Sequence, residues 1–161
     1  MALSSNETAL LQAEIEELKN NLKASERLIA EISVPVIHSI LPETALVPIT
    51  GMLYPERYEM ITSKIVKLSS AENISTIIID FSGIGSEEIG DIAHFGNGIK
   101  TLTDSLSLMG VQAIFTGFSA AVSIQLISSG LSEIQHIRTF SSFRNALKEL
   151  MKEKKMQFQS H

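Results

Sequence analysis

The sequence predicts an α/β domain with a mostly parallel sheet, preceded by one long N-terminal helix. Two observations lead to this fold class. All four prolines lie between Pro35 and Pro55, and all nine glycines lie at Gly51 or later, so residues 1–33 contain no helix breaker. Further along, short apolar runs alternate with segments whose apolar residues recur every three or four positions. This alternation is typical of crossover units in a parallel sheet.

The amino-acid composition argues against several classes of function. The 161 residues suffice for one domain and an appendage, and the net charge of −5 disfavours binding to a nucleic-acid backbone. The absence of cysteine excludes disulfides and thiolate metal sites. No apolar run approaches the ~20 residues of a membrane span, and the acidic start does not resemble a signal peptide. We therefore expect a cytoplasmic protein that binds neither nucleic acid nor membrane.

The first segment is expected to form one helix over residues 5–33. Ser4 precedes Glu7 by three residues, which is the spacing of a capping box. Seam positions then follow in alternating steps of four and three, all apolar except Ser25, which is a weak spot. This spacing predicts a parallel two-stranded coiled coil and a homodimer through residues 8–32. The alternative is an amphipathic helix packed on its own domain. The expected dimer seam comprises Leu11, Ile15, Leu18, Leu22, Ile29 and Ile32.

The remainder is expected to form a domain over residues 34–153, followed by a basic, flexible tail over 154–161. Continuous apolar runs indicate strands, and apolar residues at helical spacing indicate helices. The expected strands cover 34–40, 45–50, 74–81, 111–116 and, at one edge, 134–139. The expected helices cover 55–70, 99–109, 122–127 and 143–151.

Motifs for catalysis or cofactor binding are weak. Gly83 and Gly85 follow a strand but lack the later glycine of a dinucleotide loop, so a tight turn is the simpler interpretation. Glu87, Asp91 and His94 are spaced four and three apart and would share one helix face if a helix begins that early. They suggest either a divalent-ion site, for which no further ligand is evident, or a solvated polar face. We expect no catalytic residues, no metal and no cofactor.

Three segments in order carry a family resemblance: EISVPVIHSILPETALVPITG, IIIDFSG and MGVQAIFTGF. Over residues 34–152 they resemble a STAS domain, the anti-sigma-factor-antagonist fold. Within that group the chain looks most like the RsbR family of stressosome proteins, without the N-terminal sensor domain. Either a relative lacking the sensor or a shortened chain would explain this difference.

The resemblance implies binding rather than catalysis. It implies a non-enzymatic signalling scaffold, an anti-sigma-factor antagonist that binds sister STAS proteins and a serine/threonine switch kinase. Phosphorylation of hydroxyl residues on such a domain releases the kinase. The alternative is a small-ligand module in which the turn Ser82–Ser86 and the following helix bind a nucleotide or anion.

The first phosphate acceptor that the resemblance implies is a hydroxyl residue just after an aspartate. Counting forward from Asp80 places it at Ile89, and counting back from Gly110 places it at Ala93. The counts differ by four residues, which indicates an insertion. Because neither side chain has a hydroxyl, the usual first site is expected to be non-phosphorylatable.

The same segment carries the carboxylates Glu87, Glu88 and Asp91. They are interpreted either as a permanent imitation of phosphate or as a solvated helix start favoured by the helix dipole. The second acceptor implied by the resemblance falls near Gln125, and Ser123 is the nearest hydroxyl.

Overall fold

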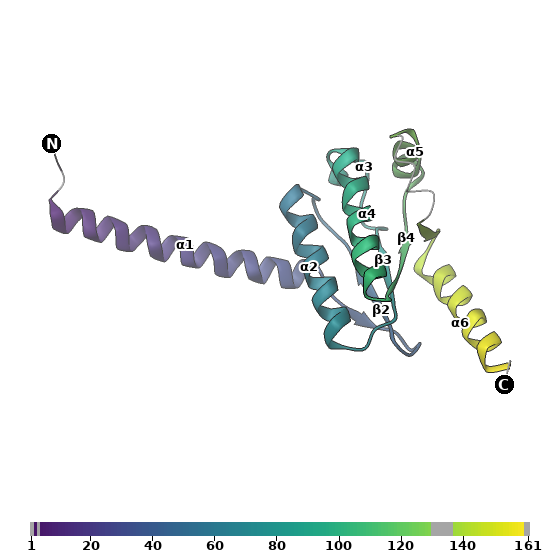
Figure 1. The fold of residues 1–161 in the computed structure, drawn as a ribbon. Coiled ribbons are helices and arrows are strands. Elements are labelled where there is room, and N and C mark those ends of the chain that lie inside the picture. The colour runs from purple at the N-terminus through teal and green to yellow at the C-terminus, as the bar shows by residue number, and fades with distance from the viewer. Residues whose placement is uncertain (1, 3, 130–136, 160–161) are drawn as a thin grey trace. The chain divides into compact units, whose positions relative to one another are not determined.

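The computed structural model describes residue 2 and residues 4–129 and 137–159 (Figure 1). The chain divides into two compact units, Met1–Ser33 and Val34–His161, which are described separately.

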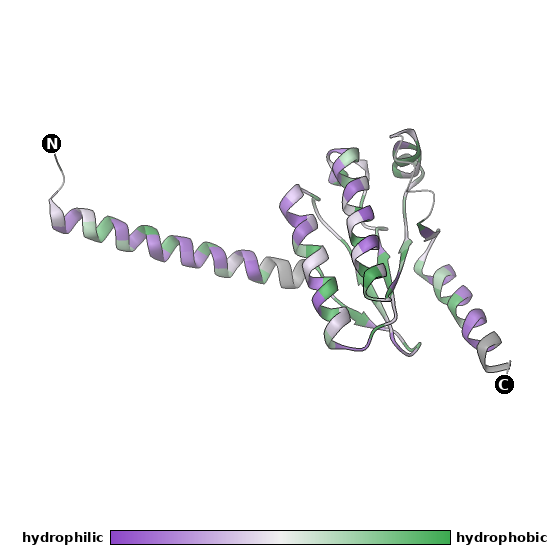
Figure 2. Cartoon of the chain, viewed as in Figure 1, coloured by the Kyte–Doolittle hydropathy of each residue, from purple (hydrophilic) through white to green (hydrophobic). Residues whose placement is uncertain are grey.

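The first unit is helix α1 (Ser5–Ser33). Its capping box is confirmed, since the Ser4 amide donates to the Glu7 carboxylate at 3.0 Å and the Glu7 amide donates to the Ser4 hydroxyl at 3.3 Å. Side chains 5–28 are all exposed, and Figure 2 shows apolar positions recurring along the helix. The exposed set includes the expected seam residues Leu11, Ile15, Leu18 and Leu22. The side chains of Ile29 and Ile32 lie outside the described residues.

The second unit is built on one five-stranded sheet. Strand β1 pairs with β2 in antiparallel orientation, and the other neighbours are parallel, so the mostly parallel sheet is confirmed. The order in the sheet follows the chain: β1 (Ile37–His38), β2 (Thr44–Pro48), β3 (Thr76–Asp80), β4 (Gln112–Thr116) and β5 (Arg138–Phe140).

The helices of the second unit connect and follow the strands. They are α2 (Pro55–Ala71), α3 (Ser86–Ile89), α4 (Ile92–Leu108), α5 (Ala120–Ser128) and α6 (Phe143–Gln159). Helix α6 continues to Gln159, past residue 154, where the basic, flexible tail was expected to begin. The edge strand expected over 134–139 falls partly outside the described residues, and β5 occupies 138–140.

Two hydrophobic cores cover the two faces of the sheet. Helices α2, α4 and α5 pack on one face, where Ile77 and Ile79 point. Helix α6 packs on the other face against Ile78 and Ile114. Because side chains alternate along a strand, β3 needs apolar residues on both faces, which explains its uninterrupted apolar run (Figure 2).

Candidate functional site

The carboxyl ends of β3 and β4 lie side by side and carry the loops to α3 and α5. In open parallel sheets this edge is the usual place for binding. Asp80 ends β3 directly opposite Thr116, the last residue of β4. The fully buried Thr116 hydroxyl donates to the Asp80 carboxylate at 2.6 Å, and the Ser82 hydroxyl donates to the same carboxylate. The Asp80 side chain is therefore bonded to the first residues of one loop and to the strand end before the other.

Gly117 brings the two loops into backbone contact. Its φ is +78°, and a Cβ atom there would lie 2.6 Å from the Ser82 backbone nitrogen. Only glycine fits this conformation and this approach. Phe118 then stacks on Phe81 with ring centroids 5.3 Å apart, which fixes the relative position of the loops.

Three amides of the turn after β3 donate to acceptors at the end of β3, in the turn or in α3. The Ser82 amide donates to the Asp80 carboxylate at 3.4 Å, the Ile84 amide to the Phe81 carbonyl at 2.9 Å, and the Gly85 amide to the Glu88 carboxylate at 2.9 Å. An anion needs free amide donors at such a turn. Because these three amides are already bonded, the geometry disfavours an anion or nucleotide site within Ser82–Ser86.

The amino terminus of α4 is also capped from within the chain. One oxygen of Asp91 accepts from the Ala93 amide at 2.7 Å and from the His94 amide at 3.3 Å. These bonds satisfy two of the amides that a helix start leaves unpaired, and the carboxylate complements the helix dipole.

Glu87, Asp91 and His94 would share a helix face only if one helix covered all three, and the structure has no such helix. Gly90, at φ +67°, separates α3 from α4, so Glu87 and His94 lie on different helices. Asp91 and His94 approach to 3.9 Å. Among the described residues, no three histidine or carboxylate side chains are placed to hold a metal ion.

The two candidate acceptor positions have different environments. Ile89 is 1% exposed and belongs to the core beneath α3. Ala93 is exposed in the first turn of α4, and Ser123 is partly buried on α5. Glu87 is also exposed, whereas Glu88 is partly buried where it accepts from the Gly85 amide.

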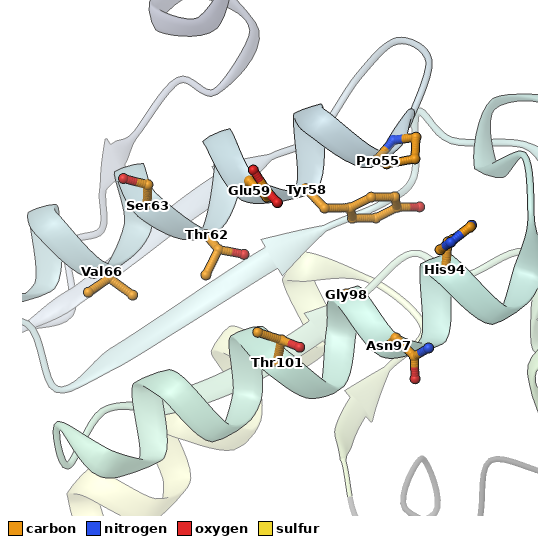
Figure 3. A pocket seen from close by; sticks show the side chains of 10 residues that line it. All are labelled: Pro55, Tyr58, Glu59, Thr62, Ser63, Val66, His94, Asn97, Gly98 and Thr101. Carbon is orange, nitrogen blue, oxygen red and sulfur yellow. The ribbon is translucent and has the colours of Figure 1, made fainter.

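A groove of about 520 Å³ runs between α2 and α4 (Figure 3). The Tyr58 ring lies against Gly98, where a Cβ atom would come within 2.7 Å of the ring. Burial raises the pKa of the Tyr58 hydroxyl above its ordinary value, and the hydroxyl donates to the Ile89 carbonyl at 3.5 Å. Sequence reasoning missed this groove, because the helix was expected to begin only at residue 99, after Gly98.

Comparisons with known proteins show which sequences and structures this chain is similar to. The sequence matches no protein-family model. It is 27% identical over 113 residues to the RsbT co-antagonist protein RsbRB of Bacillus subtilis. The matched residues make up 70% of this chain and 39% of that protein. The fold is similar to a variant of RsbS from Moorella thermoacetica, with a TM-score of 0.61 and 19% identity over 76% of this chain and 97% of that one.

The chain contains an RsbR-like STAS domain. A structure on the molecular architecture of the stressosome, described as a signal integration and transduction hub, includes a chain with a TM-score of 0.58. That chain is 17% identical, and the match covers 74% of the present chain and 98% of the other. The RsbR-like chain spans about two-fifths of the length of RsbRB. Within its described residues, no helix is long and apolar enough to cross a bilayer.

Proposed function

We propose that this RsbR-like chain is a non-enzymatic signalling scaffold in the cytoplasm. It acts as an anti-sigma-factor antagonist and stressosome component that binds sister STAS proteins and a serine/threonine switch kinase. The observation that carries the proposal is the similarity to RsbRB across 113 residues, supported by the STAS fold. The internally bonded turn amides favour this role over the alternative of a small-ligand module.

In this proposal the usual first phosphorylation site is silent. The position that is accessible to a kinase, Ala93, has only a methyl group. The other position, Ile89, is buried and also lacks a hydroxyl. Phosphorylation during signalling is then confined to α5, where Ser123 is the nearest hydroxyl to the second acceptor position.

The carboxylates of this surface have local structural roles. Asp91 caps α4, and Glu88 accepts from the amide at the start of α3. These bonds support a helix-start role for both residues. Glu87 is the exposed member of the set and makes the surface negative without the second charge of a phosphate.

The scaffold is proposed to dimerise through α1. In a parallel, in-register coil, Ile15 and Leu22 occupy a positions, while Glu14 and Lys19 occupy g and the following e position. A g residue of one helix faces the next e residue of its partner, so Glu14 and Lys19 attract each other across the seam twice in a symmetric dimer. This charge pattern supports the parallel arrangement.

Co-elution from a sizing column tests the scaffold role. We expect the full chain, mixed with a sister STAS protein, to form a complex larger than either component and to retain the cognate switch kinase. A ligand module would instead show a rise in melting temperature with one member of a nucleotide panel, because ligand binding stabilises the folded state. Such a rise without any complex would refute the scaffold role.

A further inference from the structure

The outer face of α6 carries a stripe of basic side chains. Successive residues of a helix are rotated by about 100°, so positions spaced by four, four and three residues share one narrow face. The opposite face of α6 is buried through Ala146 and Leu150 against the sheet. The side chains of the stripe are all exposed, and we name them the basic stripe: Arg144, Lys148, Lys152 and Lys155.

The two glutamates of α6 near the stripe neutralise little of it. Glu153 pairs with Arg138 of β5, on the side facing the domain. Glu149 is partly buried and approaches Lys152 at 4.0 Å, a distance at which an exposed pair contributes little. The stripe extends over about 16 Å of helix at 1.5 Å per residue and presents an excess of positive charge.

The rest of the chain has the opposite charge. Four of the 13 basic residues lie on the basic stripe, which leaves nine basic residues against 18 acidic ones. Nucleic acid and anionic lipid are extended polyanions, and the acidic surface of the rest of the chain would repel them. The charge distribution therefore favours an acidic protein surface as the occupant.

One such acidic surface lies on this same chain, at the amino ends of α2 and α4. The Leu53 amide donates to the Glu88 carbonyl at 2.7 Å, which joins the start of α2 to α3. Glu59 and His94 line the same end of the α2–α4 groove (Figure 3). We name its four exposed carboxylates the acidic rim: Glu56, Glu59, Glu87 and Asp91.

The basic stripe and the acidic rim belong to opposite layers of the domain. Helices α2 and α4 pack on one face of the sheet and α6 packs on the other (Figure 1). One copy cannot bring its own two surfaces together, so a contact between them joins different copies head to tail. We propose that the basic stripe on α6 of one copy binds the acidic rim of a second copy. This contact extends the proposed scaffold and depends on neither the kinase nor the coil.

The test is the mass of the full chain by light scattering at low salt and at about 1 M salt, where charges are screened beyond about 3 Å. We expect the low-salt mass to be about twice the high-salt mass or more, because head-to-tail contacts add whole units. The variant Lys148→Glu/Lys155→Glu should have the same mass in both buffers. The control Lys67→Glu/Lys100→Glu changes the net charge by the same amount as the stripe variant, but its substitutions lie on α2 and α4. The mass of this control should still depend on salt.

A charge exchange makes the test specific. The variant Glu56→Lys/Glu59→Lys/Glu87→Lys should also fail to associate alone, because both of its surfaces are basic. Mixed with Lys148→Glu/Lys155→Glu, it should recover association, since its unchanged basic stripe meets the unchanged acidic rim of the other variant. A salt-independent mass of the unmodified chain, or no recovery on mixing, would overturn the proposal. If the mass does not depend on salt and the chain binds phosphatidylserine vesicles only when the basic stripe is intact, the stripe binds a membrane surface and the proposal is overturned.

Discussion

The hydroxyl of Thr116 donates a 2.6 Å hydrogen bond to the carboxylate of Asp80, 36 residues earlier in the chain. This bond joins the ends of two adjacent parallel strands below the loops that lead to α3 and α5. Both surfaces proposed to take part in signalling follow these loops. This buried polar contact therefore helps to fix their relative position, together with the stacking of Phe118 on Phe81.

Replacing Thr116 with valine should lower the free energy of unfolding by about 1–3 kcal/mol, because Asp80 loses a buried donor while the volume at residue 116 is kept. Urea denaturation measures this change. The control Thr101→Val, at an exposed position on α4, should change the free energy by less than about 0.5 kcal/mol. Equal effects of the two substitutions would show that the bond contributes nothing.

Alanine substitutions at Gly117 and Gly110 distinguish the energetic cost of backbone strain from the cost of a steric clash. Both have positive φ, but an added Cβ atom meets the Ser82 backbone at residue 117 and has nothing within 4 Å at residue 110. We expect Gly110→Ala to cost about 1–2 kcal/mol, the strain of a left-handed conformation alone. Gly117→Ala should cost clearly more, since two backbones must move apart. Equal melting temperatures for the two variants would contradict the close approach.

The seam of α1 predicts the oligomeric state. Leu18→Glu combined with Leu22→Glu places like charges in the seam and should convert the dimer to a monomer by light scattering at high salt. The control Ala13→Glu combined with Asn20→Glu adds the same charge at f positions, on the far side of a coiled coil. That control should remain dimeric. A doubly substituted seam that keeps the dimer mass would exclude α1 as the interface.

The sequence predicted the elements that depend on local patterns. The capping box of Ser4 and Glu7 and the buried run ending at Asp80 are each determined by neighbouring residues. The sequence analysis did not predict α3, the turn at Gly90 or the first turns of α4, because Glu87, Asp91 and His94 keep helical spacing across Gly90 without marking where a helix begins. Only the structure shows that Asp91 begins a new helix there.

The geometry of the site could not be read from the sequence, because it depends on strand register. Asp80 meets Thr116 only when β3 and β4 pair in the register observed here. The burial of Ile89 likewise follows from packing between α3 and the sheet. By contrast, the basic stripe on α6 follows from the spacing of Arg144 and three lysines once the helix is known to continue past residue 153.

Mass spectrometry of a reaction with the cognate switch kinase and ATP tests the central claim most directly. We expect residues 84–95 of the unmodified chain to carry no phosphate, with any modification on Ser123. Ala93→Thr places a hydroxyl at an exposed position and should gain phosphate there. Ile89→Thr should gain none, because residue 89 is buried. Stoichiometric phosphate on Ser86 of the unmodified chain would contradict the account, since the switch would then be intact and displaced.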